Sequence, residues 1–84
     1  MVIKETVNLM LSESATDRLT AEYWQTKTRT EKLDAYIAKA EAGEPIEAKD
    51  SIEVLKAQGE AMHNYMYFLE MRMRMNGLLE SEGV

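Results

Sequence analysis

Hydrophobic positions recur at alternating spacings of three and four residues along two stretches of the chain, as in a helix that packs along another helix. In the first stretch the spacings are 4, 3, 4, 3, 4 and 3, and the positions are Leu19, Tyr23, Thr26, Thr30, Leu33, Ile37 and Ala40. In the second they are 3, 4, 3, 4, 3 and 4, at Ile52, Leu55, Gly59, Met62, Met66, Leu69 and Met73. The pattern predicts two long helices, over about residues 16–41 and 51–76.

The segment between these helices, residues 42–50, has the composition of a loop. It contains Gly43 and the only proline, Pro45, and a glycine followed by a proline ends helices. Asp50 or Ser51 is the expected cap of the second helix, and Gly77 begins a tail over residues 77–84. Because a short connection brings two helices together, the sequence predicts an all-α antiparallel hairpin, forming one domain over residues 1–84.

Residues 25–30, QTKTRT, alternate in a way that is typical of a strand. The helical spacing extends on both sides of them over about three heptads, so the helix is the stronger prediction. Threonines at core positions 26 and 30 make this the weakest helix-forming part of the chain.

The second predicted helix carries a further apolar row beside its inner positions: Val54, Ala61, Tyr65, Phe68 and Met75. A hairpin covers only one row internally, so this row is exposed in a monomer. We therefore expect a homo-oligomeric helical bundle, with Tyr65, Phe68 and Met75 at the interface. Apolar residues near the amino terminus predict a short helix over about residues 2–12, which either folds onto its own hairpin or swaps onto a neighbour.

Composition excludes several classes of function. The chain of 84 residues has no cysteine and one histidine, so neither disulfides nor a metal site are expected. A net charge of −5 disfavours general binding to DNA or to membrane surfaces, and the absence of a long apolar run favours a soluble cytosolic protein. His63 has no partners that make up a catalytic constellation, so we expect no catalytic residues, no cofactor and no enzymatic activity.

Basic residues gather in the first helix despite the acidic balance. Arg18, Lys27, Arg29 and Lys32 are interleaved with Tyr23, Trp24 and threonines. Arginine and lysine bind phosphate, and aromatic rings stack on bases, so the candidate ligand-binding residues are Arg18, Tyr23, Trp24, Arg29 and Lys32, with Arg72 from the second helix. The competing interpretation is a mixed-charge surface in which these cations pair with Glu22, Glu31 and Asp34.

The same residues resemble a known family. Residues 17–37, DRLTAEYWQTKTRTEKLDAYI, are similar to the first half of a small phage-encoded hairpin family, and residues 55–73, LKAQGEAMHNYMYFLEMRM, to the second half. The matching positions are Arg18, Leu19, Glu22, Arg29, Lys32, Leu33, Tyr36 and Ile37, then Leu55, Gln58, Ala61, Met62, Tyr65, Leu69, Arg72 and Met73. The family includes small proteins of crAss-like and other tailed phages and is related to the hairpin shared by anti-CBASS and anti-Thoeris sponges.

This resemblance implies a helical homo-oligomer, a hexamer in the sponges, that acts in the host cell cytoplasm. Such a protein sequesters cyclic oligonucleotides or cyclic ADP-ribose type signals without cleaving them. The chain departs from the family at Thr26, Thr30 and Gly59, where larger aliphatic residues are usual. In an antiparallel register centred near residue 46, Gly59 lies opposite residues 33–37, and Tyr36 is the expected neighbour that fills the space.

Two functions remain open at this stage. The first is a sponge for nucleotide-derived second messengers, with binding residues at subunit junctions. The second is a protein-interaction module, an adaptor or inhibitor that docks a protein on the outer apolar row. Binding of single-stranded nucleic acid is disfavoured by the net charge.

Overall fold

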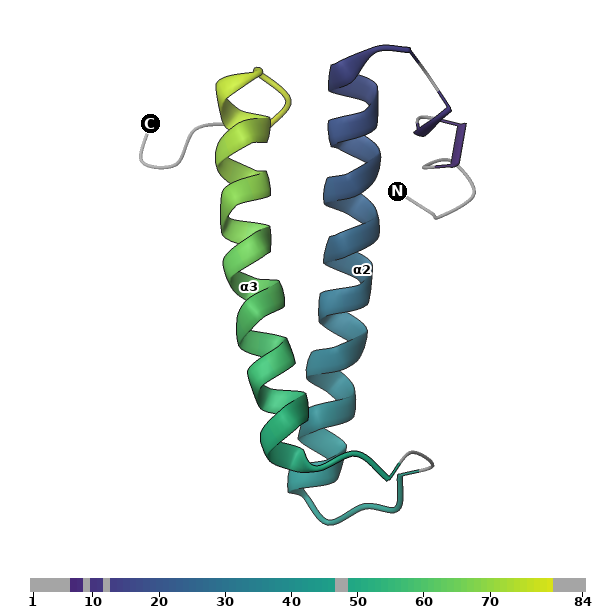
Figure 1. The fold of residues 1–84 in the computed structure, drawn as a ribbon, viewed down its shortest axis with the longest axis vertical. Coiled ribbons are helices and arrows are strands. Elements are labelled where there is room, and N and C mark those ends of the chain that lie inside the picture. Colours follow the sequence, from purple (N-terminus) through teal and green to yellow (C-terminus); the bar gives the residue numbers. More distant parts are fainter. Residues whose placement is uncertain (1–6, 9, 12, 47–48, 80–84) are drawn as a thin grey trace.

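Two long helices lie side by side and antiparallel, joined by a loop at one end (Figure 1). The computed structural model describes residues 7–8, 10–11, 13–46 and 49–79. Helix α2 is Ala15–Glu41 and helix α3 is Ile52–Met75. Within the described ranges there is no strand, so the predicted all-α hairpin is confirmed, and QTKTRT lies wholly inside α2.

Side chains cap both helices at their amino ends. The Ser14 hydroxyl accepts a hydrogen bond from the Asp17 N–H, and the Ser51 hydroxyl accepts one from the Val54 N–H at 3.1 Å. These bonds satisfy backbone donors that have no partner within the helix. Of the two cap residues that the sequence offered for α3, the structure uses Ser51.

Glycines end both helices in the same way. Gly43 and Gly77 have positive φ angles of 79° and 71°, which a residue without a Cβ adopts at little cost. The turn after α2 is closed by the Glu44 N–H, which donates to the Lys39 carbonyl at 3.0 Å, and the turn after α3 by the equivalent bond from Leu78 to Met73 at 2.8 Å. The chain thus leaves each helix within one turn.

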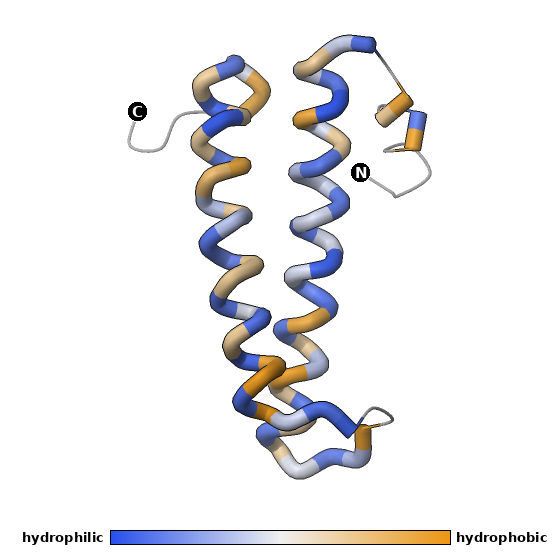
Figure 2. The backbone as a smooth tube through the Cα atoms, in the orientation of Figure 1, coloured by the Kyte–Doolittle hydropathy of each residue, from blue (hydrophilic) through white to orange (hydrophobic). Residues whose placement is uncertain are grey.

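The core lies where the inner positions of the two helices meet. It includes Leu19, Tyr23, Met66, Leu69 and Met73, with Trp24 and Leu79 packed against its edge. Figure 2 shows hydrophobic positions alternating with hydrophilic ones along both helices, which is why most of the buried side chains of each helix lie on one stripe. Ala21 of α2 is also buried, although it lies outside this stripe. No helix in the described part of the chain is long and apolar enough to cross a membrane.

Thr26 and Thr30 are buried at two of the core positions of α2. The Thr30 hydroxyl donates a hydrogen bond of 2.7 Å to the Thr26 carbonyl, one helical turn earlier. Since its polar atom is satisfied within the helix, the side chain can present its methyl group to α3 without leaving an unpaired hydroxyl.

The inner face of α3 has no side chain at Gly59. The nearest atoms to a Cβ at this position would be Cδ1 of Ile37, at 3.2 Å, and Cδ2 of Leu33, at 4.0 Å. The neighbours therefore come from the expected stretch of residues 33–37, but Ile37 occupies the space that the sequence analysis assigned to Tyr36.

The short helix expected over residues 2–12 falls mostly outside the described residues. Of those that are described, Leu11 donates a backbone hydrogen bond to Val7 at 3.2 Å. Met10 lies against its own α2, where its sulfur accepts a hydrogen bond from Gln25. This contact places Met10 next to the groove described below.

Candidate functional site

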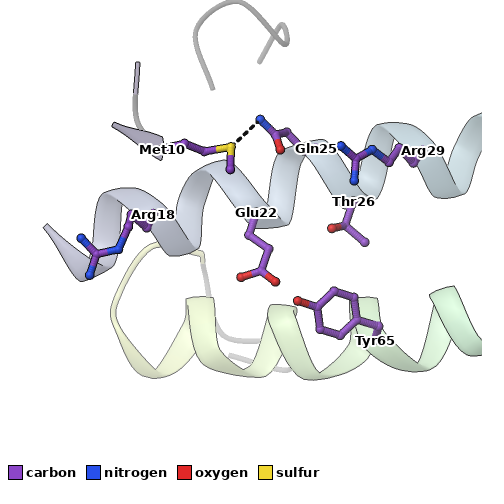
Figure 3. A pocket seen from close by; sticks show the side chains of 7 residues that line it. All are labelled: Met10, Arg18, Glu22, Gln25, Thr26, Arg29 and Tyr65. Carbon is purple, nitrogen blue, oxygen red and sulfur yellow. Dashed lines mark hydrogen bonds between the residues drawn. The ribbon is translucent and has the colours of Figure 1, made fainter. Parts of the chain in front are cut away.

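A groove of about 510 Å³ opens between the helices at one side of the hairpin (Figure 3). Its described lining comes from the amino-terminal segment, from α2 and from α3: Met10, Arg18, Glu22, Gln25, Thr26, Arg29 and Tyr65. Gln25 donates from Nε2 to the Met10 sulfur at 3.0 Å, which joins the amino-terminal wall to α2. Two of the predicted ligand-binding residues, Arg18 and Arg29, thus border one cavity.

Helical spacing explains why α2 presents these side chains together. Glu22 follows Arg18 by four residues and Arg29 follows Glu22 by seven, so the three side chains occupy one side of the helix. In an antiparallel pair, equivalent sides of the two helices face the same way. Tyr65 projects from that side of α3, and Figure 3 shows its hydroxyl end directed toward the carboxylate of Glu22.

Lys32 and Arg72 extend the positive charge beyond the groove. Lys32 lies three residues after Arg29, and Arg72 lies seven after Tyr65, so both continue the same side of the hairpin, and both are exposed. We call Arg18, Arg29, Lys32 and Arg72 the basic face. Lys32 and Arg72 do not line the groove itself.

The two aromatic residues predicted to stack on a base lie elsewhere. Tyr23 is only 5% exposed and is part of the core. Its ring makes an edge contact with Trp24 at 5.0 Å between centroids, and the Lys27 ammonium lies 4.9 Å from the centre of the Trp24 ring. The structure therefore does not bring Tyr23 and Trp24 together with Arg18 and Arg29, because their positions in α2 point to the core and to the opposite side.

Burial also changes the acidity of Tyr23. Removal from water raises the pKa of its phenol above the ordinary value of 10.0, because burial disfavours the phenolate. The carboxylate of Glu70 raises the pKa further, and the Arg74 guanidinium acts in the opposite direction. This side chain remains a neutral, packed phenol at physiological pH.

The three residues predicted for an oligomer interface lie on the outer surface of α3. Phe68 is 59% exposed and Met75 is 81% exposed in the single chain, and Tyr65 is exposed at the rim of the groove. Tyr65 and Phe68 lie on the same side of the hairpin as the basic face. The basic face is therefore next to two of the three candidate interface residues.

Glu22 and Tyr65 are groove residues that the sequence analysis did not assign to a ligand site. The spacing of four residues from Arg18 could have found Glu22. The antiparallel pairing, which brings the side of α2 holding Arg18 and Arg29 next to the side of α3 holding Tyr65, could have found Tyr65. In the sequence alone, these two rows belong to separate helices with no stated contact.

A smaller hollow of about 160 Å³ lies on the opposite side of the hairpin, bordered by Lys27, Thr30, Glu31, Asp34, His63, Met66 and Glu70. His63 of α3 contacts Asp34 of α2 there, with Nε2 at 2.8 Å from Oδ2 and 3.0 Å from Oδ1. This contact links the two helices across an exposed surface. No group of three potential metal ligands occurs among the residues that the structure describes.

These features define a class of protein: an all-α helical hairpin whose open groove combines cations with an aromatic ring. A model of the Sequestin family matches residues 13–75, and the chain belongs to this family. The family name is consistent with a role in sequestering a molecule and suggests that this molecule is small. No curated protein and no solved structure matches the chain.

Proposed function

We propose that the chain is a phage anti-immune sponge that sequesters nucleotide-derived second messengers, cyclic oligonucleotides or cyclic ADP-ribose type signals, without cleaving them. The observation that carries this proposal is the groove in which Arg18, Arg29 and Tyr65 border one cavity. Membership of the Sequestin family supports it through the meaning of the family name. The resemblance to phage sponges of cyclic nucleotides motivates the choice of ligand class.

The groove has the chemistry that a cyclic nucleotide needs. Guanidinium groups bind phosphate oxygens through paired, charge-assisted hydrogen bonds, and a tyrosine ring stacks on a base. Arg18 and Arg29 are the phosphate-binding residues in this proposal, and Tyr65 replaces Tyr23 and Trp24 as the stacking residue. The cavity of about 510 Å³ falls within the range of roughly 300 to 1,000 Å³ that is usual for small-molecule sites.

A second copy of the chain completes the site in this proposal. The groove is open to solvent in the single chain, and the exposed side chains of Phe68 and Met75 lie on or beside the same surface. A partner that covers these apolar side chains also closes the groove and brings Lys32 and Arg72 toward the ligand. The proposed assembly is a homo-oligomer acting in the host cell cytoplasm, and the resemblance to the sponges favours a hexamer.

The test is a panel of cyclic dinucleotides, cyclic trinucleotides and cyclic ADP-ribose isomers, with melting temperature and titration calorimetry as readouts. A ligand that binds the folded state raises the melting temperature by mass action. The bound ligand is then released by heating, and mass spectrometry is expected to show the mass of the intact ligand. No shift at high micromolar ligand across the panel contradicts the proposal, and recovery of a cleaved product contradicts sequestration.

The exposed apolar surface of α3 supports a second candidate function, that of an adaptor or inhibitor that docks a protein partner. Val54, Tyr65, Phe68, Met71 and Met75 are all exposed in the single chain. Light scattering separates the candidates, because a stable monomer that binds no nucleotide favours the adaptor, whereas a closed oligomer favours the sponge.

A further inference from the structure

One acidic side chain lies within the otherwise basic groove. Glu22 lines the cavity together with Arg18 and Arg29. It stands one turn after Arg18 and two turns before Arg29 on the same side of α2. A site built only to attract phosphate gains nothing from a carboxylate at its centre, since like charges repel.

Among the described residues, no cation forms an ion pair with the Glu22 carboxylate. Within the described part of the chain it takes part in no ion pair and no hydrogen bond, although it is half-buried. Figure 3 shows the carboxylate directed away from α2 toward α3, where the hydroxyl end of Tyr65 points back at it. Because no described residue donates a hydrogen bond to this carboxylate, its two oxygens can accept hydrogen bonds from a molecule in the groove.

We propose that Glu22 makes the groove selective for guanine, by accepting hydrogen bonds from the N1–H and the N2 amino group of the base. This inference rests on the proposed function and names the base that the site prefers. A carboxylate has two acceptor oxygens side by side, and guanine offers two adjacent donors along its Watson–Crick edge. Tyr65 stacks on the same base, and the guanidinium groups of Arg18 and Arg29 hold the phosphates.

Other nucleotide donors fit this carboxylate less well. Adenine has an acceptor at N1 beside its N6 amino group, so its Watson–Crick edge presents a lone pair to one of the two carboxylate oxygens. A ribose hydroxyl supplies one donor in a cyclic dinucleotide with 3′–5′ links, and the sugar has no flat face for Tyr65. A polar site rejects an analogue that leaves its buried acceptor without a partner, which makes guanine the matched ligand.

The experiment measures affinities of the full chain for cyclic di-GMP, cyclic di-AMP and cyclic di-IMP, which lacks the N2 amino group. We expect cyclic di-GMP to bind about tenfold more tightly than either analogue, because each analogue loses at least one charge-assisted hydrogen bond to Glu22. In Glu22→Gln the preference for cyclic di-GMP is expected to disappear, because the amide offers one acceptor in place of two. Glu60→Gln, an exposed position of α3, is the matched control and keeps the preference.

Each outcome bears on the inference. Equal affinities for the three ligands in the natural chain overturn the guanine assignment while leaving the sponge proposal intact, and this comparison needs no variant. Tighter binding of cyclic di-GMP that persists in Glu22→Gln assigns the selectivity to another residue and overturns the role of Glu22. A 2′-deoxy analogue of cyclic di-GMP that binds the natural chain more weakly than cyclic di-GMP does, but binds Glu22→Gln equally well, assigns the donor to the ribose and also overturns the guanine assignment. Absence of binding by all cyclic nucleotides overturns the proposed function as well.

Discussion

Gly59 of α3 faces the side chain of Ile37 in α2, so closely that a Cβ at position 59 would lie 3.2 Å from Cδ1 of Ile37. The helices approach each other here because one of them lacks a side chain. Glycine inside a helix costs about 1 kcal/mol relative to alanine. Gly59 thus has two effects: it allows the helices to approach closely, and it lowers the stability of α3.

Gly59→Ala is expected to stabilise the hairpin by up to about 1 kcal/mol. The atom in the way is the terminal methyl of a partly exposed isoleucine, which can rotate toward solvent. Gly59→Leu is expected to destabilise by roughly 1 to 3 kcal/mol, because it overpacks the contact. Urea denaturation measures both changes. Ala57→Gly, at an exposed site of the same helix, gives the helix contribution alone, and destabilisation by Gly59→Ala contradicts this account.

Substitutions at Thr30 separate the methyl group from the hydroxyl. Thr30→Ser keeps the hydroxyl, which bonds to the Thr26 carbonyl, and removes a buried methyl, for an expected loss of about 1 kcal/mol. Thr30→Val keeps the shape and removes the hydroxyl together with its bond, for a smaller change of either sign. Chemical denaturation of both variants makes the comparison. If Thr30→Val costs more than Thr30→Ser, the hydroxyl contributes more to stability than its geometry indicates.

Alkaline pH is expected to destabilise the fold through Tyr23. Burial raises the pKa of this phenol, so the folded chain keeps the proton at a pH where the unfolded chain has lost it. The stability contributed by Tyr23 is present below a pH of about 10 and is lost as the pH rises through the folded pKa. Denaturation midpoints between about pH 8 and 11 measure this loss, which Tyr23→Phe is expected to reduce. Tyr67→Phe, at an exposed position, is the matched control for removing a phenol hydroxyl.

Arg29→Ala is expected to weaken binding of cyclic dinucleotides about tenfold, since it removes a charge-assisted contact with phosphate. The loss should shrink as salt is added, because added ions screen the attraction that the natural chain exploits. Titration calorimetry at two ionic strengths measures both effects. Lys39→Ala is the control, because this exposed lysine lies on α2 roughly 15 Å along the axis from Arg29. If both variants lose the same affinity, the effect comes from the net charge of the chain and not from a specific binding site.

Phe68→Glu is expected to convert the proposed homo-oligomer to a smaller species, because it places a charge in the apolar surface that a second copy would cover. Tyr67→Glu is a closely matched control: the two rings touch edge to edge with 5.5 Å between centroids, and their exposures, 58% and 59%, are nearly equal. They project from different sides of α3, so only Phe68 adjoins the basic face. Light scattering reads the mass of each variant, and an unchanged mass for Phe68→Glu excludes this interface.

The core of the hairpin was predictable because each helix repeats its inner positions often enough to outweigh local exceptions. QTKTRT illustrates this: its alternation spans six residues, whereas the helical spacing continues from Leu19 to Ala40. The occupant of the space at Gly59 was not predictable in the same way. A shift of one residue in register exchanges Tyr36 for Ile37, and repeat spacing alone does not fix the register to that accuracy.

The candidate site was predictable only in part, for a different reason. Arg18 and Arg29 share a side of one helix, which spacing reveals. The groove is also lined by Tyr65, which comes from the antiparallel helix α3. Its position beside Arg18 and Arg29 follows from how the two helices pair. Tyr23 was assigned to the ligand site because its residue type suits a ligand, but its inner position on α2 places it in the core.

The placement of apolar side chains and cations on one surface links two equilibria. In the proposed oligomer, a second copy that covers Phe68 would also remove Arg29 and Arg72 from water, and desolvating cations opposes association. An anion that pairs with these cations first lowers that cost, and by thermodynamic reciprocity association then strengthens the hold on the anion by the same factor. In the proposed oligomer, the concentration of ligand would therefore regulate the assembly of the protein that binds it.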